Sequence, residues 1–192
     1  MSDAVKITAT KPVTGAEHGV LAQLVWIGAF AAATALGARI EIPHQPVPYT
    51  LQTMVVLLAG AFLGPRNGAF SQLLYVAAGT LGAPVFASGG VGIATLFGPT
   101  GGYLLAFPVA SLLVGYLVQQ NRSLAWILIS MAVGLLVIFA SGTLHLFAFY
   151  LHDAAAALTS GFLLFTWWDL LKLFAAGMSY YEIAKRWPRV GR

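Results

Sequence analysis

Two oppositely charged side chains interrupt an otherwise apolar helical segment near the C-terminal end of the chain. Asp169 and Lys172 follow two tryptophans in the run Trp167-Trp168-Asp169-Leu170-Leu171-Lys172. Residues three apart project from neighbouring positions of one helix face, about 60° apart around the axis. Charges inside a membrane span are costly and usually functional. We therefore expect the pair to serve a substrate or proton site, with a self-neutralising packing pair as the alternative.

The composition is that of an integral membrane protein. Of the 192 residues, 59% are hydrophobic and 8% are charged, and the mean hydropathy is +0.83. A soluble domain carries roughly 25% charged residues. No Asp, Glu, Lys or Arg lies between Arg66 and Arg122. The chain has no cysteine, which excludes disulfides and cysteine-ligated metal sites.

Apolar runs separated by polar residues, glycine or proline predict an all-α fold with six transmembrane helices. The expected helices are 19–38, 50–64, 67–82, 103–119, 123–147 and 158–185, the first of them an uncut span. Gly64-Pro65 predicts a tight hairpin between the second and third, with one long kinked helix as the alternative. On these bounds Asp169 lies about 16 Å into the last helix, near the middle of the membrane.

The basic residues predict the orientation of the spans. Six spans place eight of them on one side, namely Lys6, Lys11, Arg66, Arg122, Lys185, Arg186, Arg189 and Arg192, and Arg39 alone on the other. The positive-inside rule then places both termini in the cytoplasm. The net charge of +4 therefore reports membrane topology, and we expect no nucleic-acid partner.

The outer loops are chemically richer than the inner ones. Loop 39–49 holds three prolines and predicts a stiff extended segment ahead of Gln52, which is a candidate ligand contact or a wetted interfacial amide. Segment 82–103 holds seven glycines and two prolines, which exclude a regular span. It is too apolar for disorder, so we expect it to fold back onto the bundle and to bury Phe86 and Phe97.

Other polar groups suggest weaker alternatives. Ser141 and His145 are four apart on one predicted helix and permit a hydrolase dyad, but no Gly-x-Ser-x-Gly motif is present. His145, His152 and Asp153 permit a metal site, although the spacing fits poorly. Interfacial histidines and interhelical hydrogen bonds explain these residues more simply, and we expect no metal site.

Three motifs, in register with Asp169-Leu170-Leu171-Lys172, carry a resemblance to a known family. They are Pro46-Val47-Pro48-Tyr49-Thr50-Leu51-Gln52-Thr53, Leu63-Gly64-Pro65-Arg66-Asn67-Gly68-Ala69-Phe70-Ser71-Gln72-Leu73-Leu74-Tyr75 and Phe97-Gly98-Pro99-Thr100-Gly101-Gly102-Tyr103. Over about residues 19–185 the chain resembles BioY, the biotin-binding S components of energy-coupling factor (ECF) transporters. The resemblance implies a six-helix S-component bundle with an outward-facing vitamin pocket, and no enzymatic activity or cofactor of its own.

The resemblance also implies roles for individual residues. Asp169 would accept hydrogen bonds from the ureido ring of biotin, and Lys172 would meet the carboxylate or the ureido carbonyl. The other candidate binding residues are Gln52, Phe86, Phe97, Gly101, Gly102, Tyr103 and Trp168, with Trp167 beside them. Small residues on the first helix, Ala29, Ala31, Ala33 and Ala35, would dock onto a transmembrane T subunit that works with two ATP-binding subunits. Internal packing of these alanines is the alternative.

The expected organisation is a cytoplasmic segment 1–18, a membrane domain 19–186 with the substrate pocket, and a basic cytoplasmic tail 187–192. The leading hypothesis is biotin capture at the outer face of a prokaryotic cytoplasmic membrane. An S component for another small vitamin, such as thiamine or a biotin precursor, and an intramembrane hydrolase are the alternatives.

Overall fold

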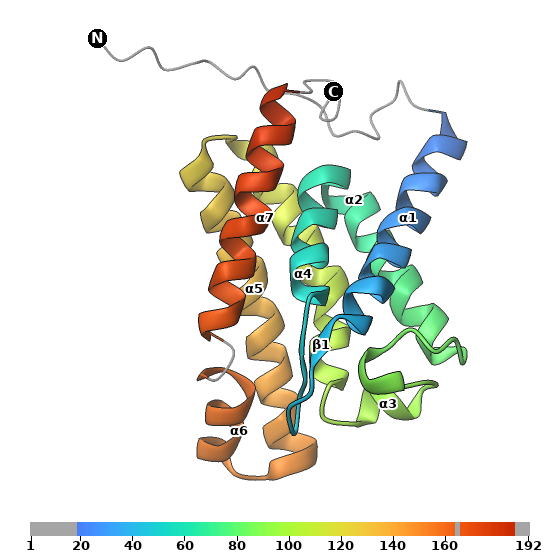
Figure 1. The fold of residues 1–192 in the computed structure, drawn as a ribbon, viewed down its shortest axis with the longest axis vertical. Coiled ribbons are helices and arrows are strands. Elements are labelled where there is room, and N and C mark those ends of the chain that lie inside the picture. The colour runs from blue at the N-terminus through green and yellow to red at the C-terminus, as the bar shows by residue number, and fades with distance from the viewer. Residues whose placement is uncertain (1–18, 164–165, 187–192) are drawn as a thin grey trace.

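The computed structural model describes residues 19–163 and 166–186, which form a bundle of roughly aligned helices (Figure 1). The long helices are α1 (Val20–Arg39), α2 (Gln52–Thr80), α4 (Gly101–Gln120), α5 (Leu124–Leu146) and α7 (Thr166–Arg186). The shorter elements are β1 (Glu41–Ile42), β2 (Tyr49–Thr50), η1 (Ala87–Gly89), α3 (Ala94–Phe97), η2 (Phe147–Leu151) and α6 (Ala154–Gly161). The predicted segments 1–18 and 187–192, with their basic residues, lie outside the described residues.

The element α2 is a helical hairpin, as the Gly64-Pro65 break predicts. Gly64 has φ 77°, a left-handed conformation that favours glycine. The amide Nε2 of Gln52 donates to the hydroxyl of Tyr75 at 2.5 Å. In one continuous helix these residues would be about 35 Å apart, since each residue advances 1.5 Å. The chain therefore reverses at Gly64, and the alternative of one long kinked helix is wrong.

Glycines allow the α2 hairpin and α4 to pack backbone against backbone. A Cβ atom added to Gly60 would lie 2.3 Å from the carbonyl oxygen of Ser111, and one added to Gly115 would lie 2.5 Å from the backbone nitrogen of Pro65. Small residues at helix crossings permit this approach in membrane bundles, where packing between helices replaces the hydrophobic effect. The close crossing of α2 and α4 holds the centre of the bundle together.

Replacing Gly60 by Ala is expected to destabilise the bundle by about 1–3 kcal/mol, because the added methyl group meets backbone that cannot move aside. Gly28 on α1 is the matched control, since a Cβ there meets nothing within 4 Å. Gly28→Ala should leave stability unchanged or slightly raise it. Thermal unfolding in detergent compares the two variants, and equal melting temperatures would contradict this account of the crossing.

The last predicted helix is divided in two, which corrects the expected span 158–185. Asp153 caps α6, accepting from the backbone amide of Ala156 at 2.9 Å, and α6 ends at Gly161. The carbonyl of Gly161 accepts from the hydroxyl of Tyr103 at 2.7 Å, so it bonds to α4 instead of continuing the helix. The new helix α7 starts at Thr166. Asp169 is thus about 5 Å from the start of its helix, and the expected 16 Å was wrong.

The loop regions confirm part of what the sequence predicts. The proline-containing loop 40–51 includes a two-stranded antiparallel pairing of β1 with β2, which the sequence did not suggest. The glycine-rich segment folds back onto the bundle, and Phe86 is fully buried. Phe97, in contrast, is 71% exposed, because it ends the short helix α3 with its side chain away from the core.

The two ends of the bundle differ in charge. The α2 turn with Arg66, the α4–α5 connection with Arg122 and the C-terminal end of α7 with Lys185 lie at one end, and the longer connections lie at the other (Figure 1). Among the residues that the structure describes, three helices are long and apolar enough to cross a membrane: α1, α4, and α5 with its η2 extension. The fold is that of an all-α, multi-pass membrane protein.

Candidate functional site

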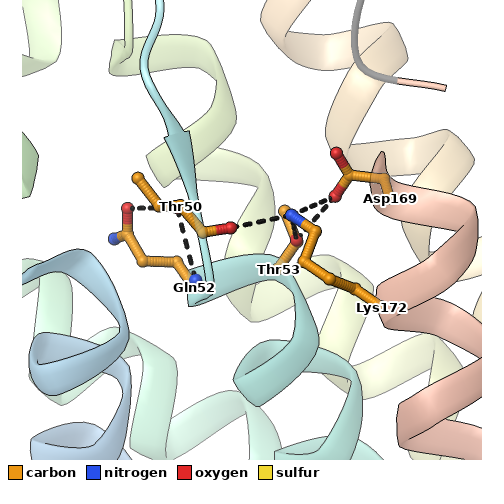
Figure 2. Close-up of polar contacts among 5 residues, drawn as sticks. All are labelled: Thr50, Gln52, Thr53, Asp169 and Lys172. Atoms are coloured by element: carbon orange, nitrogen blue, oxygen red, sulfur yellow. Dashed lines mark hydrogen bonds and ion pairs between the residues drawn. The ribbon is translucent and has the colours of Figure 1, made fainter. Parts of the chain in front are cut away.

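Asp169 and Lys172 form an ion pair buried between α7 and the start of α2 (Figure 2). The ammonium Nζ of Lys172 lies 2.5 Å from Oδ1 of Asp169, and the two residues are only 5% and 1% exposed. Thr53 lies between them: its hydroxyl donates to the same Oδ1 at 2.7 Å and accepts from Nζ at 2.7 Å. The backbone carbonyl of Thr50 also accepts from Nζ at 2.7 Å.

The two charged groups differ in whether their hydrogen-bonding positions all have partners among the described residues. An ammonium has three N–H donors, and those of Lys172 have three acceptors, Asp169, Thr53 and the carbonyl of Thr50. The second carboxylate oxygen of Asp169, Oδ2, is buried and has no hydrogen-bond partner among the described residues. A buried carboxylate oxygen without a donor is costly, and it marks a place where a ligand can donate.

Asp169 faces a cavity between α2, α4 and α7. The cavity encloses about 500 Å³ of space between its lining atoms, counting its open mouth, of which about 40 Å³ is wide enough for the centre of a water molecule. Its polar lining includes Thr50, Gln52, Thr53, Thr100, Tyr103 and Asp169, and its apolar lining Val47, Phe86, Leu104, Phe107 and Phe139. The cavity thus combines apolar walls with a few convergent polar groups, and one of these carries a negative charge.

Hydrogen bonds fix several of the polar lining groups. Besides donating to Tyr75, Gln52 accepts from the hydroxyl of Thr50 at 3.1 Å through its Oε1. The hydroxyl of Tyr75 in turn donates to the carbonyl of Val85 at 3.2 Å, which ties the glycine-rich segment to the α2 hairpin. The ring of Tyr75 contacts Phe86 edge to face, with centroids 5.6 Å apart. These contacts hold the cavity walls in place before any ligand arrives.

Comparison with known proteins shows the family. Residues 6–189 match the BioY family. The chain belongs to the BioY family. A biotin transporter BioY of Thermotoga maritima is 41% identical over 85% of this chain and 96% of its own length. Biotin transporter BioY2 of Lactococcus lactis is 40% identical over 79% of this chain and 84% of its own. The crystal structure of an S-component for biotin from an ECF-type ABC transporter superposes with a TM-score of 0.79 at 25% identity, covering 86% of this chain and 92% of that one.

The structure brings four of the predicted binding residues to the cavity of this BioY-family chain. Asp169, Gln52, Phe86 and Tyr103 all line it. They come from α7, α2, the glycine-rich segment and α4, so only the folded bundle brings them together. Lys172 lies just behind Asp169 and is not among the lining residues. Its place is that of a counter-ion that orients Asp169.

The paired glycines that open α4 pack against neighbouring elements and are not among the residues that line the cavity. A Cβ on Gly101 would lie 1.8 Å from the carbonyl oxygen of Leu96, and one on Gly102 would lie 2.3 Å from Cβ of His145. Both glycines therefore let α4 start in close contact with α3 and α5. Thr100 and Tyr103, on either side of them, line the cavity instead.

Three aromatic residues predicted for the site lie elsewhere. Phe97 is exposed at the end of α3, Trp167 is 86% exposed and Trp168 is 38% exposed. The two tryptophans border an outward-facing apolar groove with Tyr49 and Phe174 instead. The reason is helical geometry: Asp169 points inward, and on a helix the two residues before it point about 100° and 200° away.

The structure also identifies lining residues that sequence reasoning missed. Thr53 follows Gln52 directly and stands in the same motif, so its hydroxyl next to a predicted pocket was a usable signal. Phe107 and Phe139 sit within long apolar helices and look like ordinary core residues in the sequence. Phe107 stacks on Tyr75 with centroids 6.3 Å apart, which places it in the wall.

Ser141 and His145 hold the glycine-rich segment against α5. The hydroxyl of Ser141 donates to the carbonyl of Gly102 at 2.8 Å, and Nε2 of His145 lies 3.1 Å from the carbonyl oxygen of Gly98. Neither lines the cavity. No group of three metal-binding side chains occurs among the residues that the structure describes. Members of the BioY family are transporter components, so this chain is not an enzyme and the hydrolase hypothesis is wrong.

The four alanines predicted as one docking face lie on two faces of α1. Ala31 is 8% exposed and packs in the core with the half-buried Ala35, whereas Ala29 is exposed and Ala33 is half-buried. Residues two apart on a helix are about 200° apart around its axis, so alternate residues cannot share one face. Ala31 and Ala35 therefore belong to internal packing.

Proposed function

We propose that this chain is the biotin-binding S component of an ECF-type transporter, which captures biotin at the outer face of the membrane for uptake. The observation that supports this most directly is that Asp169 lines the cavity and that its buried Oδ2 has no partner among the described residues. The relatives named as biotin transporters and the solved S-component for biotin support the same assignment.

The chemistry of biotin suits this cavity. Its ureido ring carries two N–H donors, and a carboxylate oxygen is a strong acceptor for them. Asp169 is thus assigned to the ureido head, and Lys172 positions the carboxylate by occupying Oδ1. Phe86, Phe107 and other apolar lining residues would enclose the thioether ring and the aliphatic tail. Loop 39–49, which contributes Val47 and Pro48 to the lining, would act as the lid.

Direct titration tests the assignment. The detergent-purified chain is expected to bind biotin with high affinity and to show no competition from excess thiamine, which lacks a ureido group. Equal binding of thiamine, or no saturable binding of biotin, would contradict the proposal. A Ser141→Ala variant should bind like the wild type, since the Ser141 hydroxyl serves only to anchor Gly102.

The membrane setting and the partners follow from the same proposal. The chain would lie in the cytoplasmic membrane of a prokaryote with both termini inside, as the basic residues predict. A transmembrane T subunit and two ATP-binding subunits would complete the transporter. The outward face of α1, which comprises Val25, Ala29, Ala32, Ala33 and Leu36, would dock onto the T subunit, because its alanines permit close helix packing.

Replacing Ala29 by Trp is expected to reduce co-purification with the T subunit at least tenfold, while biotin binding stays within about twofold of the wild type. The indole would hold the two helices apart at a place where small residues allow contact. Leu144→Trp on α5 is the matched control, because Leu144 is 65% exposed on another helix. Equal recovery of the T subunit with both variants would contradict docking through α1.

A further inference from the structure

A second chamber lies outside the cavity that Asp169 faces. Its lining includes His44, Gln45, Ser88, Gly90 and Tyr150, and it holds about 740 Å³ of space between these atoms, counting its open mouth. Pro48, Ala87 and Thr100 line both chambers, so the two chambers adjoin each other at these three residues. The outer chamber is formed by the connections at the end of the bundle away from the α2 turn (Figure 1).

The polar groups around Asp169 belong to the inner chamber. Gln52, Thr53 and Asp169 line only the inner one. If Asp169 accepts from the ureido ring, that head lies innermost and the carboxyl end of the ligand points toward the junction at Pro48, Ala87 and Thr100. In this orientation, any group attached to the carboxyl end of the ligand would lie in the outer chamber.

Neither chamber offers a lysine or arginine among its described lining residues. The ammonium of Lys172 contacts the carboxylate of Asp169 and donates to the carbonyl of Thr50, just before α2. The guanidinium of Arg39 donates to the carbonyl of Pro84. A carboxylate lies beside the outer chamber instead: that of Glu41 accepts from the backbone amide of Ser88, a lining residue, at 2.8 Å. A carboxylate buried without a cation is strongly disfavoured, so the carboxyl end of the ligand must reach water.

We infer that this chain recognises the ureido and thioether end of its ligand and leaves the carboxyl end unrecognised, so that biotin amides, including conjugates extended at that end, also bind. The inference rests on the proposed function. The extension would leave through the outer chamber, past Gln45 and Tyr150, both of which are exposed. The substrate class is therefore biotin and its carboxyl-linked derivatives.

Competition binding with three ligands tests the inference: biotin, its neutral primary amide, and Nε-biotinyl-lysine. The amide and the lysine conjugate are expected to bind within about tenfold of biotin. A loss of 100-fold or more for the neutral amide would overturn the inference, because it would reveal a cationic contact, from His44 or another group, to the carboxylate. Failure of all three ligands, biotin included, would contradict the proposed function itself.

Variants at Gln45 test the route. Gln45 lines only the outer chamber, and its side chain is exposed. Gln45→Trp should weaken the lysine conjugate at least tenfold and biotin less than threefold. An unchanged conjugate affinity would overturn the proposed route.

A charge pair at the same position covers the case in which the tryptophan variant fails to fold. Gln45→Glu should weaken biotin about 3- to 10-fold at low salt and Gln45→Lys should strengthen it by a similar factor, while the neutral amide is unaffected. Equal responses of biotin and its amide to both substitutions would show that the carboxylate lies elsewhere, which contradicts the inference.

Discussion

Replacing Asp169 by Asn is expected to weaken biotin binding on the order of 100-fold or more. Lys172 and Thr53 both donate toward Oδ1, so the asparagine carbonyl oxygen would take that position and its NH₂ group would take the position of Oδ2. The NH₂ group would then face the ureido N–H groups, donor against donor. A lost hydrogen bond to a charged group costs about 1.5–3 kcal/mol, and an unsatisfied buried donor adds about 1–3 kcal/mol.

Equilibrium binding of radiolabelled biotin to the purified variant measures this effect. Asp153→Asn is the matched control, because Asp153 is exposed, caps α6 and does not line the cavity, and asparagine caps helices as well as aspartate does. Its binding should match that of the wild type. An Asp169→Asn variant that binds within threefold of the wild type would remove Asp169 from the ureido contact.

Replacing Lys172 by Met is expected to lower the stability of the bundle by about 3–5 kcal/mol, the usual cost of removing one partner from a buried ion pair. The methionine keeps the length of the side chain but leaves the Asp169 carboxylate buried with only the Thr53 hydroxyl as a donor. The double variant Asp169→Asn/Lys172→Met has no net charge at the site. It should regain most of the stability and still fail to bind biotin.

Thermal unfolding in detergent and biotin titration of the single and double variants separate the two roles. Lys185→Met is the control, since Lys185 is exposed near the end of α7 and should contribute little. A double variant that stays as unstable as Lys172→Met would show that the uncompensated charge of Asp169 is not the cause of the lost stability. Recovery of biotin binding in the double variant would show that the ligand needs neither charge.

Much of the architecture could be predicted because it depends on local chemistry. The Gly64-Pro65 break sets the hairpin, since Gly64 alone takes a left-handed conformation there and proline cannot continue a helix. The contact between Asp169 and Lys172 follows from helical spacing, which depends on no other part of the chain. Spans α1, α4 and α5 follow from apolar length.

Other features depend on contacts between distant segments, which a local sequence pattern does not predict. The break between α6 and α7 lies in an apolar stretch, and Gly161 ends α6 where its carbonyl meets Tyr103, 58 residues away. The close packing of Gly101 and Gly102 depends on Leu96 and on α5, so the same glycine pattern suggested a ligand contact. The alanines of α1 divide between two faces because of the helical repeat, which spacing alone could have revealed.

By itself, the sequence determined that this is a helical membrane protein, where its helices begin and end in most cases, and that one of them carries a charge pair. It did not determine which charge faces a ligand. That depends on Thr50 and Thr53, which are 122 and 119 residues from Lys172 and accept from its ammonium, while Oδ2 of Asp169 has no partner among the described residues. Hydrogen bonds between distant segments exist only in the folded chain, and for this reason only the tertiary structure could show which of the two charged residues lines the cavity and keeps an unpartnered atom.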